Sequence, residues 1–591
     1  MIHKASDPSS IALCDTQIKA HGIHYTPAEL ARYLAESLVA AYQSSAGVPQ
    51  KTLNILDPAC GDGELLLALL TALPHTARNH IRVIGCDTDA VAIERAKRRL
   101  DTCGVMRVDI VCEDFLALIS RELDGQLPLG GAMPRRTEMR MCGTIDLIIS
   151  NPPYVRTQVL GASQARVLAS QFGLQGRIDL YHAFVIAMTS ALKPNGYLGL
   201  LTSNRFLSTQ AGASLRSWLL NEMTLHTLID LGDTRLFEAA VLPAILIGKR
   251  GRLARADQQC VFRRVYETES DSSPNPRHET VLMALSAENC GTVDVASKQY
   301  RIETGILRTS ADDSAPWMLS SDKTDQWMET IRKNMAGTFS GSGDVKVGIK
   351  TTADKVFIRD DWESMPPEQR PESELLHSLI THHAAERWSL TSNACGTRRV
   401  LYPYTLSEGK RCPINFADFP KAGRYLESYR AVLEKRKYVI EAGRMWYEIW
   451  VPHSPSAWST EKLAFPDISE RNVFFMCPSE AVVNGDCYWI SPKLFAPPHA
   501  LKAMLAVANS SFALRYYDVM FHNKLYAGRR RFMSQYVAQF PLPREKHAVD
   551  LAGLVTQLLK AKANNNKRAV DALDDEIDCL VWESFGLCKE A

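Results

Sequence analysis

The chain has 591 residues, of which 46% are hydrophobic and 23% are charged, and its formal net charge at pH 7 is only +2. This length predicts two large domains, and no apolar run approaches the roughly 20 residues that a membrane-spanning helix needs. The 14 cysteines include no paired Cys-x-x-Cys set, which argues against a zinc site and against a disulfide framework.

Residues 23–250 alternate short β-rich apolar runs with helical stretches, a pattern typical of a parallel sheet with crossover helices. Expected helices include 63–72, 90–100, 183–192 and 212–222, and the Gly-, Pro- and Arg-rich stretch 123–140 is expected to be a surface insertion. The expected strands are Leu53–Leu56, Arg82–Cys86, Asp109–Cys112, Ile145–Ser150, Tyr197–Thr202, Leu225–Asp230 and Ala244–Gly248.

From about residue 335 the chain mixes aromatic, proline and basic residues with short strands, and residues 331–545 carry a net charge of about +7. Two amphipathic helical patterns follow near the end of the chain, from Val549 to Leu587. We therefore expect an N-terminal extension (1–21), a first α/β domain (22–265), a connecting region (266–334), a second, mixed α+β domain (335–545) and a helical tail (546–591).

A glycine-containing loop follows the first expected strand. It reads Asp57-Pro58-Ala59-Cys60-Gly61-Asp62-Gly63, and its glycines let the backbone approach a ligand and turn sharply into a helix. Taken alone, this pattern fits a plain tight turn equally well.

Acidic residues at the ends of the next two strands strengthen the ligand interpretation. Asp87 ends the second strand, where a carboxylate can accept both hydroxyls of a ribose. Asp114 follows the third strand and can accept a hydrogen bond from an adenine amino group, and the neighbouring Phe115 ring can stack on that adenine. Each acid alone would more often be a solvated loop residue, but the three in this order outline a nucleoside site.

The fourth expected strand runs directly into Asn151-Pro152-Pro153-Tyr154. Two consecutive prolines fix the backbone and remove two N–H donors, so the acceptors that remain are the Asn151 side-chain oxygen and the Pro152 carbonyl. An amino group held by two acceptors exposes its lone pair, which suits in-line attack on a sulfonium methyl group. Tyr154 supplies a stacking face for a base taken out of a helix.

These motifs resemble those of amino-group DNA methyltransferases. The resemblance rests on Asp57–Gly63, Asp87, Asp114-Phe115 and Asn151–Tyr154. Their order, with His24-Tyr25-Thr26-Pro27 before them and a large region after them, resembles the gamma class, which comprises the Taq-type N6-adenine methyltransferases of restriction–modification systems. The similar region covers residues 22–250 almost continuously.

The resemblance implies a Rossmann-like class I methyltransferase domain with a mostly parallel sheet, followed by a mixed α+β target-recognition domain and a short helical tail. It implies S-adenosylmethionine as the cofactor and no metal. The catalytic residues it implies are Asn151, Pro152, Pro153 and Tyr154. The cofactor-binding residues it implies are Thr26, Asp57, Pro58, Ala59, Gly61, Gly63, Asp87, Asp114, Phe115 and Asn151.

One position departs from the family. Its members often have a second aromatic ring that sandwiches the flipped adenine against the catalytic tyrosine, and the matching position here is close to Gly212, which has no ring. Phe206 lies nearby in the sequence and is the candidate that could replace it.

The region after residue 335 implies double-stranded DNA as the partner. Gly348–Ile358 resembles the opening segment of the recognition domain in Taq-type enzymes, and that resemblance implies phosphate contacts for Lys350 and Thr351. Arg529 and Arg530, in a run of three arginines, either contact phosphates or lie in a solvated loop.

Asn-Pro-Pro-Tyr suits any planar amino group, so three alternatives to DNA adenine stay open: cytosine N4 in DNA, adenine in RNA and a glutamine amide in a protein. Asn151 favours adenine because serine more often holds this position in cytosine N4 enzymes, and the large C-terminal region favours DNA. We expect a cytoplasmic, nucleoid-associated bacterial enzyme without a secretion signal or a membrane partner, and a separate restriction endonuclease that acts at the same site.

Overall fold

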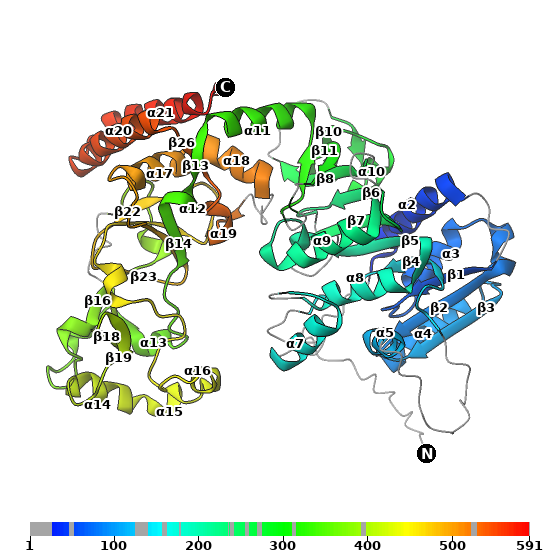
Figure 1. Cartoon of the computed structure of the whole chain (residues 1–591), viewed down its shortest axis with the longest axis horizontal. Helices are drawn as coiled ribbons and strands as arrows, with labels where there is room; N and C mark the ends of the chain where they lie inside the picture. Colours follow the sequence, from blue (N-terminus) through cyan, green and yellow to red (C-terminus); the bar gives the residue numbers. More distant parts are fainter. Residues whose placement is uncertain are drawn as a thin grey trace, which may run out of the picture. The chain divides into compact units, whose positions relative to one another are not determined.

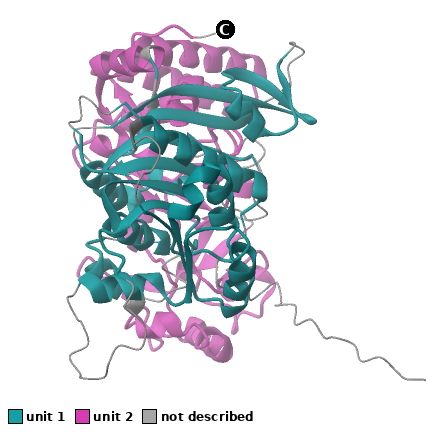
Figure 2. Ribbon diagram, turned by 90° about the vertical axis from the view of Figure 1, so that its right-hand side faces the viewer, with its two compact units in different colours: residues 1–321 teal, residues 322–591 magenta. Residues whose placement is uncertain are grey.

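The computed structural model describes residues 26–46, 52–123, 140–155, 162–175, 179–234, 236, 242–253, 259–268, 275–309, 312, 315–391, 398–521 and 529–589. Its contacts divide the chain into two compact units, Met1–Ser321 and Asp322–Ala591 (Figure 2). His24, Tyr25 and nearly all of the expected insertion at 123–140 lie outside the described residues, and the expected domain boundaries stay predictions. Across the described ranges, no helix is long and apolar enough to cross a membrane.

The first unit is built on one twelve-stranded sheet that contains all seven expected strands (Figure 1). These seven follow the order β3-β2-β1-β4-β5-β7-β6, and β7 alone among them runs antiparallel to its neighbours. The expected α/β fold with a mostly parallel methyltransferase sheet is confirmed. The strands are β1 Leu53–Asp57, β2 Ile81–Asp87, β3 Arg107–Cys112, β4 Ile145–Ser150, β5 Leu192–Ser203, β6 Met223–Asp230 and β7 Pro243–Arg250.

Two hydrophobic layers cover the two faces of this sheet, because alternate strand residues point to opposite sides. In β1, for example, Ile55 belongs to one layer and Leu56 to the other. One layer includes helices α2 (Ala28–Ala46), α3 (Glu64–Ala72) and α4 (Ala90–Leu100). The opposite layer includes α5 (Phe115–Leu123), α8 (Leu180–Ala191) and α9 (Ala213–Glu222).

The strand order places the polar ends of β1 and β4 side by side. β1 pairs in parallel with β4, with Leu56 opposite Ile148. The chain leaves β1 for helix α3 on one face, whereas it leaves β4 for helices α7 (Ala162–Gln171) and α8 on the other. Such a point, where the connections diverge at the carboxyl ends of adjacent strands, is where open α/β sheets bind their ligands.

Further strands extend the same sheet up to residue 320. β8 pairs in parallel with β6, and β11, β10 and β9 follow it, while β12 pairs with β11. Part of the region expected to connect the domains is therefore folded into the first unit. These elements are β8 Val261–Thr268, β9 Arg277–His278, α10 Val281–Ser286, β10 Gly291–Val295, β11 Lys298–Arg308 and β12 Met318–Ser320.

The second unit combines small sheets with helices, as expected for a mixed α+β domain. Its larger sheets have the orders β14-β24-β20-β22 and β15-β17-β16-β23. Their strands are Gly343–Val347, Cys487–Pro492, Lys462–Pro466 and Phe475–Cys477 in the first, and Ile358–Arg359, Arg399–Leu401, Leu376–Ile380 and Val482–Val483 in the second. Three two-stranded sheets pair β13 (Met335–Thr338) with β26 (Pro541–Pro543), β18 (Tyr404–Ser407) with β19 (Lys410–Pro413), and β21 (Ile468–Ser469) with β25 (Arg530–Arg531).

Apart from α11 at the start of the unit, the longer helices belong to its C-terminal part (Figure 1). The two amphipathic patterns at the end of the chain form α20 and α21, as expected, and both pack into the core that also contains α17 and α18. The helices of the unit are α11 Asp322–Asn334, α12 Phe339–Ser342, α13 Asp354–Phe357, α14 Pro420–Ser428, α15 Arg430–Leu433, α16 Lys437–Glu441, α17 Ala500–Asn509, α18 Ser511–Phe521, α19 Ser534–Val537, α20 Glu545–Ala563 and α21 Lys567–Ser584.

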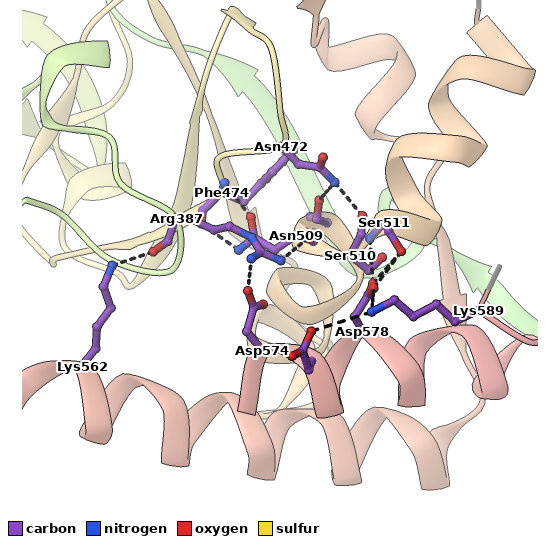
Figure 3. Close-up of polar contacts among 12 residues, drawn as sticks. Arg387, Asn472, Phe474, Asn509, Ser510, Ser511, Lys562, Asp574, Asp578 and Lys589 are labelled. Atoms are coloured by element: carbon purple, nitrogen blue, oxygen red, sulfur yellow. Dashed lines mark hydrogen bonds and ion pairs between the residues drawn. The ribbon is translucent and has the colours of Figure 1, made fainter. Parts of the chain in front are cut away.

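Polar contacts also anchor the last helix (Figure 3). Asp578 is 8% exposed, and one of its oxygens accepts from the Ser511 backbone N–H at 2.7 Å while the other accepts from Lys589 Nζ at 3.0 Å. Arg387 pairs with Asp574 and donates to the Asn509 carbonyl at 2.6 Å. Since α21 provides both acids, the end of the chain is an integral part of the second unit.

Asp578→Ala leaves the Ser511 N–H and the Lys589 ammonium without their acceptor. We expect it to lower the free energy of unfolding of the second unit by about 2–4 kcal/mol in urea denaturation. Asp571→Ala, at an exposed position of the same helix, should change it by less than about 0.5 kcal/mol. Equal effects of the two substitutions would contradict an anchoring role for Asp578.

Candidate active site at the carboxyl edge of the sheet

The loop after β1 depends on its glycines. Gly61 and Gly63 have positive φ angles of 51° and 86°, a conformation that side chains disfavour. A Cβ at Gly63 would lie 3.3 Å from the Ala96 Cβ on α4, so the start of α3 packs closely against its neighbour. The loop therefore returns over the end of β1, where the site begins.

Asp57, the last residue of β1, is 1% exposed. Its Oδ1 accepts from the Ala59 N–H at 3.1 Å, whereas its Oδ2 has no hydrogen-bond partner. Burial raises the pKa of Asp57 from its ordinary value of 3.8 to about 7. A cationic or strongly donating ligand group at this oxygen would stabilise the charged form.

Asp87, the last residue of β2, stabilises the same loop through hydrogen bonds from the backbone. Its two oxygens accept from the Gly61 N–H at 2.7 Å and from the Asp89 N–H at 2.9 Å. Because each carboxylate oxygen offers two lone pairs, both oxygens can still accept from ligand hydroxyls. The structure thus brings Asp87 and the glycine loop together, as expected for a ribose contact.

Asp114 and Phe115 differ in what they can offer a ligand. Asp114 is exposed, and its Oδ1 accepts from the Leu116 N–H at 2.9 Å at the start of α5. The Phe115 ring is 1% exposed and packs in the core, 5.9 Å from the Phe184 ring. The Phe115 ring is thus part of the core here, and its stacking on a ligand ring stays a prediction.

Residues far apart in the sequence meet at the end of β4. Asn151 Nδ2 donates to Thr26 Oγ1 at 3.0 Å, and the Tyr154 hydroxyl donates to Asn151 Oδ1. Burial raises the pKa of Tyr154, so the hydroxyl keeps its proton and acts as a donor. The Tyr154 ring packs edge-on against Tyr181, with centroids 6.3 Å apart. The Asn151 amide is thus held from both ends.

Three buried polar atoms at the ends of adjacent strands have no hydrogen-bond partner. They are Asp57 Oδ2 on β1, Ser150 Oγ on β4 and Thr202 Oγ1 on β5. Buried polar groups are nearly always paired in proteins, and a ligand bound at this edge would supply partners. The edge therefore fits a polar ligand that carries a cationic donor.

Phe206, the candidate for the second aromatic ring, is buried. It is 0% exposed and its ring centroid lies 5.7 Å from that of Trp317, so the ring is part of the core here, and its role as the second ring stays a prediction. Any Cβ at Gly212 would lie 2.4 Å from the Phe206 carbonyl oxygen. The loop between β5 and α9 is packed too tightly here for a side chain at position 212.

Arg205 is a residue of this edge that the sequence analysis missed. It lies in the short 3-10 helix Asn204–Leu207 directly after β5, and it is exposed. Its neighbour Asn204 is buried and donates to Asp230 Oδ1 at 2.9 Å, which fixes the segment. Its position could have identified it, because it follows the fifth strand at the same edge of the sheet as Asp57 and Asn151.

In the second unit, the two residues expected at phosphates near residue 350 lie in different environments. Lys350 is exposed. Thr351 is 1% exposed, its hydroxyl donates to Asp354, and its carbonyl accepts from Arg436 Nη1 at 2.9 Å. The polar groups of Thr351 thus hold the loop together here, and its phosphate contact stays a prediction.

The two arginines near residue 530 also differ. The Arg529 side chain is 58% exposed, with Nε 3.7 Å from the nearest Glu470 carboxylate oxygen. Arg530 is 12% exposed and donates to both oxygens of Asp518 at 2.7 Å. Arg530 thus forms an internal ion pair, whereas Arg529 remains on the surface, and the DNA contacts of both stay predictions.

Fold and site together define a class, the α/β methyltransferases with an Asn-Pro-Pro-Tyr amino-group site. The Eco57I restriction-modification methylase family model matches residues 82–237. Type II methyltransferase M.BanIII of Aneurinibacillus aneurinilyticus is 38% identical over 96% of this chain and 97% of its own length. M.PaeR7I of Pseudomonas aeruginosa is 25% identical over 89% and 86%. The type IIG restriction endonuclease BpuSI, a solved structure, covers 96% of this chain and 66% of its own with a TM-score of 0.40 and 15% identity.

The chain belongs to the Eco57I family of type II DNA methyltransferases of restriction–modification systems. It is an adenine-specific enzyme that acts at N6, and its family uses S-adenosylmethionine. The family resemblance, the fold and the function expected from the sequence are confirmed.

The raised pKa of Asp57 predicts that this carboxyl lowers the stability of the free enzyme while it contributes to cofactor binding. Ionisation of this buried carboxyl opposes folding increasingly as pH rises from about 4 to 7, and fully above 7. Asp57→Asn keeps an acceptor for the Ala59 N–H, so without cofactor it should unfold at higher urea concentration than the wild type at pH 8. The difference should shrink toward pH 4, and cofactor affinity in calorimetry should fall.

The exposed residue Asp101, replaced by Asn, serves as the control and should change neither quantity strongly. An Asp57→Asn variant that is no more stable than the wild type at pH 8 would show that the charge on Asp57 is already compensated.

Proposed function

We propose that this enzyme transfers the methyl group of S-adenosylmethionine directly to N6 of an adenine that is flipped out of double-stranded DNA, and that Asn151 aligns the amino group. The observation that carries the proposal is the position of the Asn151 amide. It lies at the end of β4, next to the end of β1, where Asp57 Oδ2 has no hydrogen-bond partner. Thr26 Oγ1 accepts from its nitrogen and so fixes its orientation.

The residues of the edge fit the cofactor part by part. Its ammonium group would meet Asp57, and the ribose hydroxyls would meet Asp87. The exposed carboxylate of Asp114 would accept a hydrogen bond from the amino group of the cofactor's own adenine ring. The backbone of Pro58, Ala59, Gly61 and Gly63 would lie against the cofactor, with Thr26 toward its methionine end. When bound, the cofactor supplies an electrophilic methyl group on a sulfonium.

Asn151 and Pro152 would prepare the nucleophile. The Asn151 Oδ1 and the Pro152 carbonyl accept the two N–H groups of the adenine, which withdraws the nitrogen lone pair from the ring and directs it at the methyl carbon. Transfer of the methyl group to this nitrogen would break the methyl–sulfur bond of the cofactor and leave a thioether, and the proton that the nitrogen gives up would pass to solvent water. The Tyr154 hydroxyl donates to Asn151 Oδ1 in the free enzyme, and we expect it to leave this oxygen when the amino group binds. The Tyr154 ring is then available to stack on the base.

Duplex binding would rest on exposed cations. Lys350 and Arg529 in the second unit and Arg205 in the first are exposed, and cations of this kind neutralise phosphates without reading sequence. Residues 331–545 carry about +7, which supports a nucleic-acid role for this region. We also propose that a separate restriction endonuclease acts at the same site, and that the enzyme works on the chromosome in the bacterial cytoplasm.

Asn151→Ala removes the acceptor and should reduce methyl transfer by at least about 100-fold while cofactor affinity changes little. The assay is expression in a host without DNA methylation, followed by sequencing that reports N6-methyladenine and its motif; calorimetry measures cofactor binding. Tyr154→Phe is the matched control. It keeps the ring and removes the hydroxyl that caps Asn151, so it should retain activity. A fully active Asn151→Ala enzyme would exclude the proposed mechanism.

Lys350→Ala should weaken DNA binding and reduce the slope of log K against log salt by about 0.9, because one phosphate contact is lost. Titration of a labelled duplex at several salt concentrations measures both. Arg530→Ala, which breaks the Asp518 ion pair, should lower stability but leave the slope unchanged. If the Lys350 variant kept the wild-type slope, this lysine would not contact a phosphate.

A further inference from the structure

Thr26 lies at the start of the first described helix, directly beside the catalytic motif. Pro27 follows it and accepts from the Ala31 N–H at 2.9 Å, so Thr26 leads straight into the first turn of α2. Leu30, Leu34 and Leu38 of that helix are 0% exposed. A residue at the base of a helix that is so firmly packed has a fixed position, and its hydroxyl oxygen meets Asn151 Nδ2 at 3.0 Å.

The orientation of the Asn151 amide decides whether it can hold an amino group. One end of the amide is an acceptor and the other a donor, so a half-turn about its last bond would present an NH2 group to the NH2 group of the base. In the free enzyme two hydrogen bonds oppose this turn, from Nδ2 to Thr26 and from the Tyr154 hydroxyl to Oδ1. When the base takes Oδ1, the Tyr154 bond is lost and the Thr26 bond remains.

We propose that Thr26 is a positioning residue for methyl transfer. By accepting from Asn151 Nδ2, it keeps Oδ1 toward the adenine amino group throughout the reaction. This inference rests on the proposed role of Asn151 and adds a second role to the cofactor contact that the family resemblance implies for Thr26. The two roles are compatible, because a hydroxyl that accepts from Asn151 can still donate its proton to a cofactor carboxylate.

The test compares Thr26→Val with Thr26→Ser in the full-length enzyme. The substrate is an unmethylated duplex that carries the sequence motif that the enzyme methylates. Valine keeps the shape and removes the acceptor, whereas serine keeps the acceptor. At saturating cofactor, so that weaker cofactor binding does not enter, we expect the Val variant to lose about 3- to 10-fold in kcat. The Ser variant should stay within about 2-fold of the wild type.

A second measurement separates positioning from general structural damage. Affinity is measured for two duplexes, one with adenine and one with purine, which lacks the amino group, at the target position. The ratio of the two affinities reports the hydrogen bond to Oδ1. We expect Thr26→Val to shift this ratio toward that of Asn151→Ala, and Thr26→Ser to leave it as in the wild type.

Wild-type kcat and an unchanged ratio in the Val variant would overturn the inference, and so would equal losses in the Val and Ser variants. With an inactive Asn151→Ala enzyme, either result would leave the proposed function intact. An active Asn151→Ala enzyme would instead remove the proposed function together with this inference.

Discussion

The adjacency of β1 and β4 is the constraint on which the site depends. Their helices leave on opposite faces, so the carboxyl ends of the two strands open onto the same space. Asp57 ends one strand and Asn151 follows the other. The first is buried so deeply that its pKa rises to about 7 and one of its oxygens lacks a partner. The fold therefore carries an electrostatic cost in the free enzyme that a cationic ligand would relieve.

Asn151 lies at the same edge of the sheet, but its hydrogen bonding differs from that of Asp57. Its amide is satisfied in the free enzyme, because Thr26 takes its donor end and Tyr154 covers its acceptor end. In the proposed mechanism, the adenine amino group binds to the Asn151 oxygen to which the Tyr154 hydroxyl donates here. Exchange of one hydrogen bond for another lets the base enter without leaving a buried acceptor unpaired at any stage.

The sequence predicts the elements of this arrangement well, because strand ends and polar motifs are local patterns. All seven strands and the positions of Asp57, Asp87 and Asn151 at their ends follow from such patterns. Side-chain environments do not, since they depend on partners elsewhere in the chain. Phe115 belongs to the core because Phe184 on another helix packs against it.

Partners distant in the sequence also explain why two predicted DNA-contact residues of the second unit have internal partners. Thr351 is buried under Arg436, which is 85 residues away, and Arg530 is neutralised by Asp518. A basic or hydroxyl residue in a DNA-binding region can thus be part of the internal framework, and only its exposure distinguishes the two cases. The contact between Thr26 and Asn151 spans 125 residues, and no local pattern indicates it.

The central claim is tested most directly by a structure of the enzyme in complex with a non-reactive cofactor analogue and an unmethylated duplex. The duplex carries the sequence motif that the enzyme methylates. The distance to measure joins the N6 atom of the target adenine to Asn151 Oδ1. The account predicts a hydrogen bond there, a second one to the Pro152 carbonyl, and a Tyr154 hydroxyl that has left Asn151. An adenine held by other residues, with Tyr154 still bound to Asn151, would contradict it.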